Sequence, residues 1–234
     1  MGVLNVTPDS FSDGGRYLDL DAAVTRVARM IAEGADIIDV GGESTRPGAA
    51  EVGTTEELQR VVPVITAIRA AHPDVIISVD TSKPEVMSAA VAAGAGIIND
   101  VRALTSTGAL QVAAATQAAV CLMHMQGQPD SMQVAPCYEN VVSEVSSFLT
   151  DRVKACVAAG VARERILIDP GIGFGKKPEH NLALLAHLPV FLRLQLPLLL
   201  GVSRKSLIGA ILNRPVEDRL SGGVALATAA VLSG

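Results

Sequence analysis

At 234 residues, 49% of them hydrophobic, the chain is long enough to bury a full core within one domain. A formal net charge of −5 and only 3% aromatic residues, without Trp, argue against a nucleic-acid-binding surface and against base stacking. The longest apolar run, 188–202, contains Arg193, Gln195 and two prolines, so we expect no membrane span.

Cysteine and histidine spacing gives no sign of a structural metal or a disulfide framework. The three cysteines form no CxxC pair, and the four histidines form no HxxxH or HExxH pattern. Free thiols favour a reducing compartment, so we expect a cytoplasmic protein.

Strand patterns alternate with helical patterns along the chain. Short runs rich in Val, Ile and Leu predict buried strands, and the segments between them carry apolar residues at helical spacing. Strands are expected at 1–6, 36–40, 75–79, 95–98, 120–123, 166–168 and 196–202. Helices are expected from a capping Asp21 to about Gly34, at 55–71, from Pro84, at 138–158, and in two patterns after Ser206.

Near-continuous apolar strands separated by helices predict a parallel sheet that is covered on both faces. The predicted strand ends are about 33 residues apart, close to the roughly 31 residues per unit of a (β/α)8 barrel. Polar residues follow every strand, whereas a doubly wound sheet would concentrate them at one switch point. We therefore expect the α/β class and a single TIM-barrel domain over residues 1–234.

Seven strands are one fewer than a barrel needs, and the sequence stops at 231–234 where a helical pattern is ending. Two long apolar sheet edges would then be exposed, which natural proteins avoid. We expect the eighth strand to be missing from this chain, so that the domain is incomplete at its C-terminus.

The segment from Ile166 to Lys176, ILIDPGIGFGK, combines a buried strand with a carboxylate and a glycine-rich loop. Pro170 ends the strand after Asp169, and glycines let the following backbone approach a ligand closely. Two nucleotide-binding interpretations fail on spacing. A Walker loop would need Gly at Pro170, and GxGxG is not the GxGxxG of a dinucleotide fingerprint.

The predicted strand ends and the loops that follow them together supply carboxylate, amide, hydroxyl and ammonium groups. The residues are Asn5, Asp39, Thr45, Asp80, Asn99, Asp169 and Lys205. Carboxylates and amides at one mouth suit a flat heterocycle with a guanidine-like edge, because they accept paired N–H donors. Each Asp or Asn alone could equally be a helix cap. Arg46, and Lys205 with Ser206 at a helix start, suit an anion, although Arg46 could be a solvated surface residue.

Six motifs in order along the chain resemble the bacterial dihydropteroate synthases of the pterin-binding enzyme family. They are MGVLNVTPDSFSDGG at 1–15, DVGGESTRPG at 39–48, SVDTS at 78–82, IINDV at 97–101, DPGIGFGK at 169–176 and SRKS at 203–206. The resemblance implies a (β/α)8 barrel that condenses 6-hydroxymethyl-7,8-dihydropterin diphosphate with 4-aminobenzoate. The products would be pyrophosphate and 7,8-dihydropteroate, in folate biosynthesis, and sulfonamides would compete with 4-aminobenzoate.

The resemblance also assigns roles to residues. It places Asn5 as a ligand of Mg²⁺, which would engage the diphosphate, and Lys205, Arg46 and Asp39 as catalytic residues. The substrate-binding residues that it implies are Thr45, Asp80, Asn99, Asp169, Lys205, Ser206, Phe174 and Met123.

The sequence departs from the family at its end. The family's last strand carries an Arg-x-His-Asp-Val motif that is expected to hold the diphosphate, and this sequence stops before it. The segment before the first strand is also short. We expect the 234-residue chain alone to be unstable or nearly inactive, and a complete version to be active.

Two alternative functions remain open. One is a pterin-binding barrel that transfers methyl from methyltetrahydrofolate to a corrinoid, although SRKS and the loop after Asn5 would then lack a purpose. The other is a non-catalytic pterin-binding barrel. We expect small-molecule partners, no nucleic acid or membrane, and a homodimer.

Overall fold

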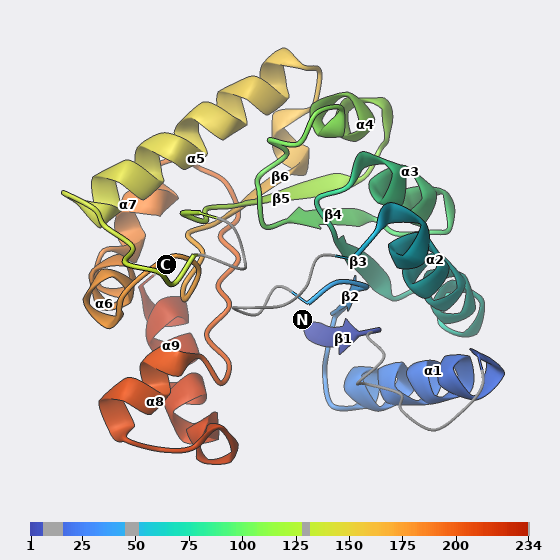
Figure 1. The fold of residues 1–234 in the computed structure, drawn as a ribbon, viewed down its shortest axis with the longest axis horizontal. Helices are drawn as coiled ribbons and strands as arrows, with labels where there is room; N and C mark the ends of the chain where they lie inside the picture. The colour runs from blue at the N-terminus through green and yellow to red at the C-terminus, as the bar shows by residue number, and fades with distance from the viewer. Residues whose placement is uncertain (7–15, 45–51, 128–131, 234) are drawn as a thin grey trace.

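Six parallel strands form one sheet, in which strands adjacent in the sequence are also neighbours in space (Figure 1). The computed structural model describes residues 1–6, 16–44, 52–127 and 132–233. The strands are β1 (Gly2–Asn5), β2 (Ile37–Gly41), β3 (Ile76–Asp80), β4 (Ile97–Asp100), β5 (Ala119–Met123) and β6 (Ile166–Asp169). The order β1-β2-β3-β4-β5-β6 is that of a (β/α)8 barrel, because a doubly wound sheet would reverse direction at its first strand.

Helices follow the strands and lie in a ring outside the sheet (Figure 1). They are α1 (Arg16–Ala32), α2 (Thr54–Ala71), α3 (Pro84–Ala92), α4 (Ala109–Ala115), α5 (Val141–Ala158), α6 (Pro178–Ala186), α7 (Leu188–Leu192), α8 (Ser206–Leu212) and α9 (Leu220–Leu232). Two short 3-10 helices, η2 (Arg163–Arg165) and η3 (Val216–Arg219), precede β6 and α9. No helix in the described ranges is both long and apolar enough to cross a membrane.

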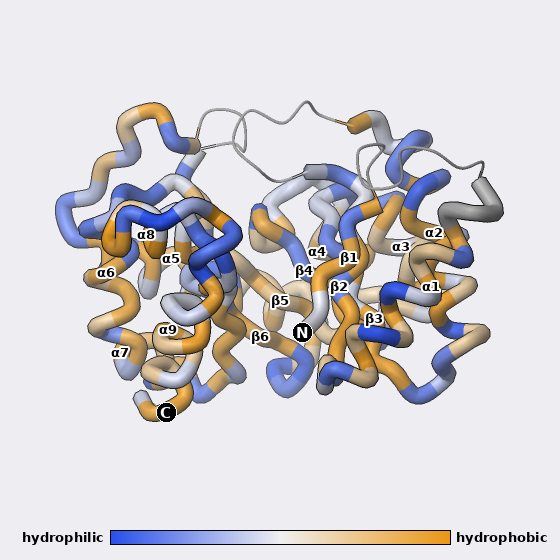
Figure 2. Tube along the Cα trace, turned by 90° about the horizontal axis from the view of Figure 1, so that it is seen from below, coloured by the Kyte–Doolittle hydropathy of each residue, from blue (hydrophilic) through white to orange (hydrophobic). Residues whose placement is uncertain are grey.

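The core lies between the sheet and the helices. Ile38, Val40, Ile77, Val79 and Ile98 are completely buried on the central strands. Figure 2 shows hydrophobic segments along the strands, with α1 to α3 on one side and α5 to α9 on the other. Burial on both faces explains why these strands appear in the sequence as continuous apolar runs.

The first six predicted strands are confirmed within one or two residues, but the seventh, at 196–202, is wrong as a strand. Leu198 forms only one isolated parallel bridge, with Ile168. The amide of Ile168 donates to the carbonyl of Pro197 at 3.0 Å, and Leu199 donates back at 2.9 Å. Pro197 has no N–H to extend that ladder. The segment therefore lies beside β6 without forming a regular strand.

Two helices begin at residues other than those predicted from the sequence. Helix α1 begins at Arg16, so Asp21 lies inside the helix and does not cap it. Helix α5 begins at Val141, where the Asn140 side chain accepts a hydrogen bond from the amide of Ser143 at 3.0 Å. Asn140 is thus the N-cap, as its residue type favours. The predicted start at Pro84 is confirmed, with proline in the first turn of α3.

Candidate active site

The register of the sheet aligns five strand ends in one row. Asn5 pairs with Gly41, Gly41 with Asp80, Asp80 with Asn99, and Asn99 with Cys121. Carboxyl ends of parallel strands are the edge where α/β barrels place their active sites. The row therefore brings one carboxylate and two amides, from residues 5, 80 and 99, to the same rim.

Asp39 lies two residues before the row on β2 and contacts it. The side-chain amide of Asn99 donates to Oδ2 of Asp39 at 3.2 Å. Asp39 is buried, and burial raises its pKa. Its Oδ1 atom has no hydrogen-bond partner among the described residues. A buried carboxylate oxygen in this situation can accept a donor from a ligand.

Asp80 lies in the most acidic part of the rim. Its pKa is raised well above the usual range, first by burial and then by repulsion from Asp39, Asp100, Glu57 and Glu43. A carboxyl group in this environment is stabilised by hydrogen-bond donors or by a cation, which is the chemistry expected at a site for an N–H-rich ring.

Asp169 ends β6 and is 7% exposed. Its Oδ1 atom accepts a hydrogen bond from the amide of Gly171 at 2.7 Å. Burial raises the pKa of Asp169 to about 6, against the opposing effects of that amide, Lys205 and Lys176. The carboxylate is thus held in place by the first residue after Pro170.

The loop after Asp169 depends on glycine. Gly171, Gly173 and Gly175 have φ angles of +69°, +86° and +60°, a region that side chains rarely adopt. A Cβ atom on Gly171 would lie 1.9 Å from the carbonyl oxygen of His124, and one on Gly175 would lie 2.3 Å from that of Gln126. The glycines therefore let the loop pack directly against the backbone that follows β5.

We expect Gly171→Ala to destabilise the fold more than Gly160→Ala. Gly160 also has a positive φ, +101°, but a Cβ atom there would meet nothing within 4 Å. Both changes impose left-handed strain of about 1–2 kcal/mol. Gly171→Ala adds a backbone clash of about 1–3 kcal/mol. Urea unfolding of both variants measures the difference, and equal losses would show that the loop can move away from His124.

Lys205 approaches this loop from the other side. It precedes α8 and is half-buried, and its Nζ atom lies 4.3 Å from the centroid of the Phe174 ring. Burial lowers the pKa of Lys205, while Asp169 and Asp80 act in the opposite direction. The ammonium group, an aromatic face and two carboxylates therefore belong to one electrostatic site.

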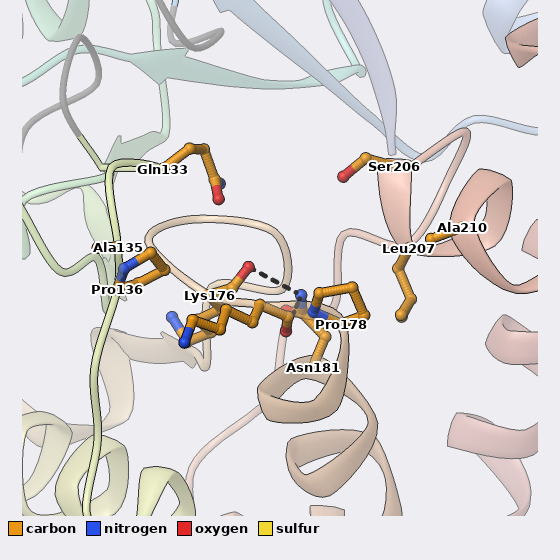
Figure 3. Close-up of a pocket in the computed structure, with 10 residues that line it drawn as sticks. Gln133, Ala135, Pro136, Lys176, Pro178, Asn181, Ser206, Leu207 and Ala210 are labelled. Atoms are coloured by element: carbon orange, nitrogen blue, oxygen red, sulfur yellow. Dashed lines mark hydrogen bonds between the residues drawn. The ribbon is translucent and has the colours of Figure 1, made fainter.

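Ser206 lines a separate hollow of about 250 Å³ at the same rim. Figure 3 shows Gln133 and Ser206 on opposite sides of it, with Pro178 and Asn181 between them. Asp80 lines a second hollow of about 270 Å³ together with Lys83 and residues of the β4–α4 connection. The rim thus offers space on both sides of the strand ends.

The structure brings most of the predicted site residues to this rim. Asn5, Asp39, Asp80, Asn99, Met123 and Asp169 lie on the strands, with Met123 paired to Asp169, and Phe174, Lys205 and Ser206 lie on the following loops. Thr45 and Arg46 lie outside the described residues. Among the described residues, no three His, Cys, Asp or Glu side chains gather as a metal site.

Sequence reasoning missed two buried charged clusters. Lys83 donates to Glu43 and to Glu57, each at 2.6 Å, and the Glu57 side chain is fully buried. Lys176 contacts His124 beneath the glycine loop. Both clusters join residues more than 25 positions apart in the sequence, so no local pattern indicates them.

A sequential parallel sheet with acids, amides and a lysine at the carboxyl ends of its strands defines an α/β barrel-type enzyme with a small-molecule site. The chain belongs to the pterin-binding enzyme family, because the family profile described as "Pterin binding enzyme" matches residues 1–234.

Relatives of this chain are dihydropteroate synthases. The chain is 56% identical over 234 residues to that of Escherichia coli strain K12, covering all of this chain and 83% of the relative. A crystal structure of the Yersinia pestis dihydropteroate synthase with a sulfonamide drug has a TM-score of 0.92 and 52% identity, covering 99% of this chain and 84% of that one. The Xanthomonas albilineans enzyme with 4-aminobenzoic acid has a TM-score of 0.92 and 51% identity, with 100% and 83% covered.

Proposed function

We propose that this chain is a dihydropteroate synthase, a transferase of folate biosynthesis that joins 6-hydroxymethyl-7,8-dihydropterin diphosphate to 4-aminobenzoate. The main support for this function is the 56% identity to the Escherichia coli enzyme along the whole chain. The rim that holds Asp80, Asn99 and Asp169 in one sheet supports the same function, because these groups suit the N–H-rich edge of a pterin.

The pterin site is proposed to use side chains from four strands and two loops. Asp80 and Asp169 would accept N–H groups of the ring, and Asn99 would both accept and donate. Lys205 and Phe174, which already contact each other, would lie at the ring. Met123, beside Asp169 in the register, would add an apolar contact.

The second substrate is proposed to bind near the start of α8. Ser206 lies at the first turn of that helix and lines the hollow shown in Figure 3. Its hydroxyl group can donate to the carboxylate of 4-aminobenzoate. Thr45 and Arg46 are proposed, from the motif alone, to complete the site.

The reaction needs no nucleophilic side chain. The bond between the pterin methylene carbon and the diphosphate oxygen breaks, and its electron pair leaves with pyrophosphate. The arylamine nitrogen then forms the new C–N bond and loses a proton. We propose that Lys205 and Arg46 stabilise negative charge, while Asp39 orients the Asn99 amide and faces the positive charge that develops on the pterin.

We propose that Mg²⁺ takes part in this reaction, on the chemistry of the groups at the rim. Asn5 supplies one amide oxygen at the end of β1, and Mg²⁺ in nucleotide and phosphate sites typically takes few protein ligands and several from water and phosphate. The donor set therefore fits an ion that arrives with the diphosphate and that Asn5 helps to hold. When bound, Mg²⁺ would neutralise charge on the departing pyrophosphate.

Pyrophosphate release tests the function. We expect release to require both 4-aminobenzoate and the dihydropterin diphosphate, with dihydropteroate as the second product. Binding of the diphosphate without turnover would favour a non-catalytic pterin-binding protein, and methyl transfer from methyltetrahydrofolate would favour the corrinoid alternative.

We also propose a cytoplasmic location and a homodimer. The location is supported by Cys121, Cys137 and Cys156, which are free thiols. The dimer is proposed from the family resemblance alone. Sedimentation of the purified protein tests the assembly.

A further inference from the structure

Lys176 is a buried lysine whose hydrogen bonds are all made inside the protein. It is 3% exposed. Its Nζ atom lies 2.9 Å from Nδ1 of His124, 3.2 Å from the His124 carbonyl oxygen and 2.9 Å from the Phe174 carbonyl oxygen. An ammonium group has three protons, and these three acceptors use all of them. Lys176 therefore has none left for a substrate.

The three contacts connect two segments that carry the pterin-facing residues. His124 follows β5, and its amide donates to the carbonyl of Asp169 at 3.0 Å. Phe174 lies in the glycine loop after β6, and its ring contacts the ammonium group of Lys205. Lys176 thus joins the end of one strand to the loop that follows the next strand.

Other side chains hold the remaining backbone groups of the loop. Asn181 accepts from the amide of Gly173 at 2.8 Å, and Gln133 donates to the Gly173 carbonyl at 2.7 Å. The hydroxyl of Tyr138 donates to the carbonyl of Gly175 at 2.8 Å. The loop is therefore held before any ligand binds, and Lys176 is the charged member of the set that holds it.

Besides fixing the loop, Lys176 acts electrostatically on the Asp169 carboxylate. Besides the Gly171 amide, the titratable groups that interact with this carboxylate are the ammonium groups of Lys205 and Lys176 and the thiol of Cys121. Burial lowers the pKa of Lys176 to about 7, and burial followed by the neighbouring Lys176 lowers that of His124 to about 3. Below pH 7 the pair is thus a charged lysine beside a neutral imidazole, whose Nδ1 atom accepts.

We propose that Lys176 is a positioning residue for pterin recognition, which fixes the carbonyl of Phe174 against His124 and keeps a positive charge behind the Asp169 carboxylate. This inference rests on the proposed pterin site. Lys176 would act on the pterin through Phe174 and Asp169 without touching it, and its side chain also borders the hollow that contains Ser206.

Replacing Lys176 with methionine keeps the length of the side chain but removes its charge and its donors. We expect the affinity for dihydropterin diphosphate to fall about tenfold, because the buried His124 carbonyl and the partly buried Phe174 carbonyl lose a donor and the loop is no longer fixed. The pKa of Asp169 should also rise without the nearby cation, so loss of binding on acidification should begin at higher pH. We expect that shift to be on the order of half a pH unit or more.

Calorimetric titrations between pH 5 and pH 8 on the parent, Lys176→Met, Lys176→Arg and Lys154→Met measure both effects. Lys154 is an exposed lysine on α5 that pairs with Asp151, so Lys154→Met is the matched control and should match the parent. Lys176→Arg keeps the charge and should keep the pH dependence of the parent, even if the affinity falls. A purely structural role would lower affinity without moving the pH dependence.

Three outcomes separate the hypotheses. Unchanged affinity and pH dependence in Lys176→Met overturn this inference while leaving the proposed function intact. No binding by the parent at any pH contradicts the proposed function itself. If Lys176→Met does not fold, hydrogen exchange on the unmodified protein tests whether the loop is fixed before a ligand binds. We expect slow exchange at the amides of Gly171, Gly173 and Phe174, and fast exchange there would refute a loop that is fixed in advance.

Discussion

Replacing Asp80 or Lys205 with alanine is expected to weaken binding of dihydropterin diphosphate tenfold or more, a loss of at least about 1.4 kcal/mol. Asp80 belongs to the row of strand ends, and Lys205 interacts electrostatically with both Asp80 and Asp169. Each truncation removes an ionisable hydrogen-bonding group from a partly desolvated site, where such groups contribute most.

Matched controls for both changes lie on α5. Asp151 and Lys154 form an exposed pair at 3.0 Å, with side chains that are 66% and 72% exposed. Asp151→Ala and Lys154→Ala remove the same chemical groups from a solvated surface and should leave binding unchanged. Titration calorimetry on all four variants is the measurement. If Asp80→Ala and Lys205→Ala bind as tightly as these controls, neither residue belongs to the pterin site.

Lys83→Met is expected to lower the free energy of unfolding by about 3–5 kcal/mol, because it leaves the Glu57 carboxylate buried without a counter-ion. Lys83 bridges Glu57 and Glu43 at 2.6 Å each, and the Glu57 side chain is fully buried. Burial alone would lower the pKa of Lys83, but the two hydrogen-bonded glutamates outweigh it and raise the pKa. A loss of this size is a large share of the stability of an ordinary domain.

The comparison with an exposed ion pair makes this prediction specific. Lys154→Met breaks the surface pair with Asp151 and should cost about 0–1 kcal/mol. Adding Glu57→Leu to Lys83→Met removes the stranded carboxylate and should restore part of the lost stability. Chemical unfolding of the parent and of the three variants measures these differences in the free energy of unfolding. A single Lys83→Met variant within 1 kcal/mol of the parent would show that the buried Glu57 side chain does not depend on Lys83.

Most of the sheet could be predicted from the sequence because its strands are buried on both faces. Such strands appear as short apolar runs that end in a polar residue, and Asp80, Asn99 and Asp169 each marked the point where a strand reaches the rim. The segment 196–202 has the same composition, yet it forms only one bridge. Apolar composition reports burial, whereas strand formation also requires a continuous partner for the backbone.

The site could be predicted only for residues that sit at strand ends or within the recognised motifs. Contacts such as Asn99 with Asp39 follow from the barrel order once it is assumed. Glu57 and Lys176 could not be found in this way. From the sequence, a glutamate in the first turn of a helix and a lysine after a glycine loop are both expected to be exposed to solvent. In the structure both are buried, because their partners come from distant segments of the chain.

The close packing of the glycine loop limits how the enzyme can evolve under inhibitor pressure. Added side chains at Gly171 or Gly175 would strike backbone atoms, which cannot rotate away as side chains can. Resistance to a competing drug requires a change that the natural substrate tolerates, and Gly171 and Gly175 have little room for one. Escape from inhibition would therefore have to arise on other segments of the rim.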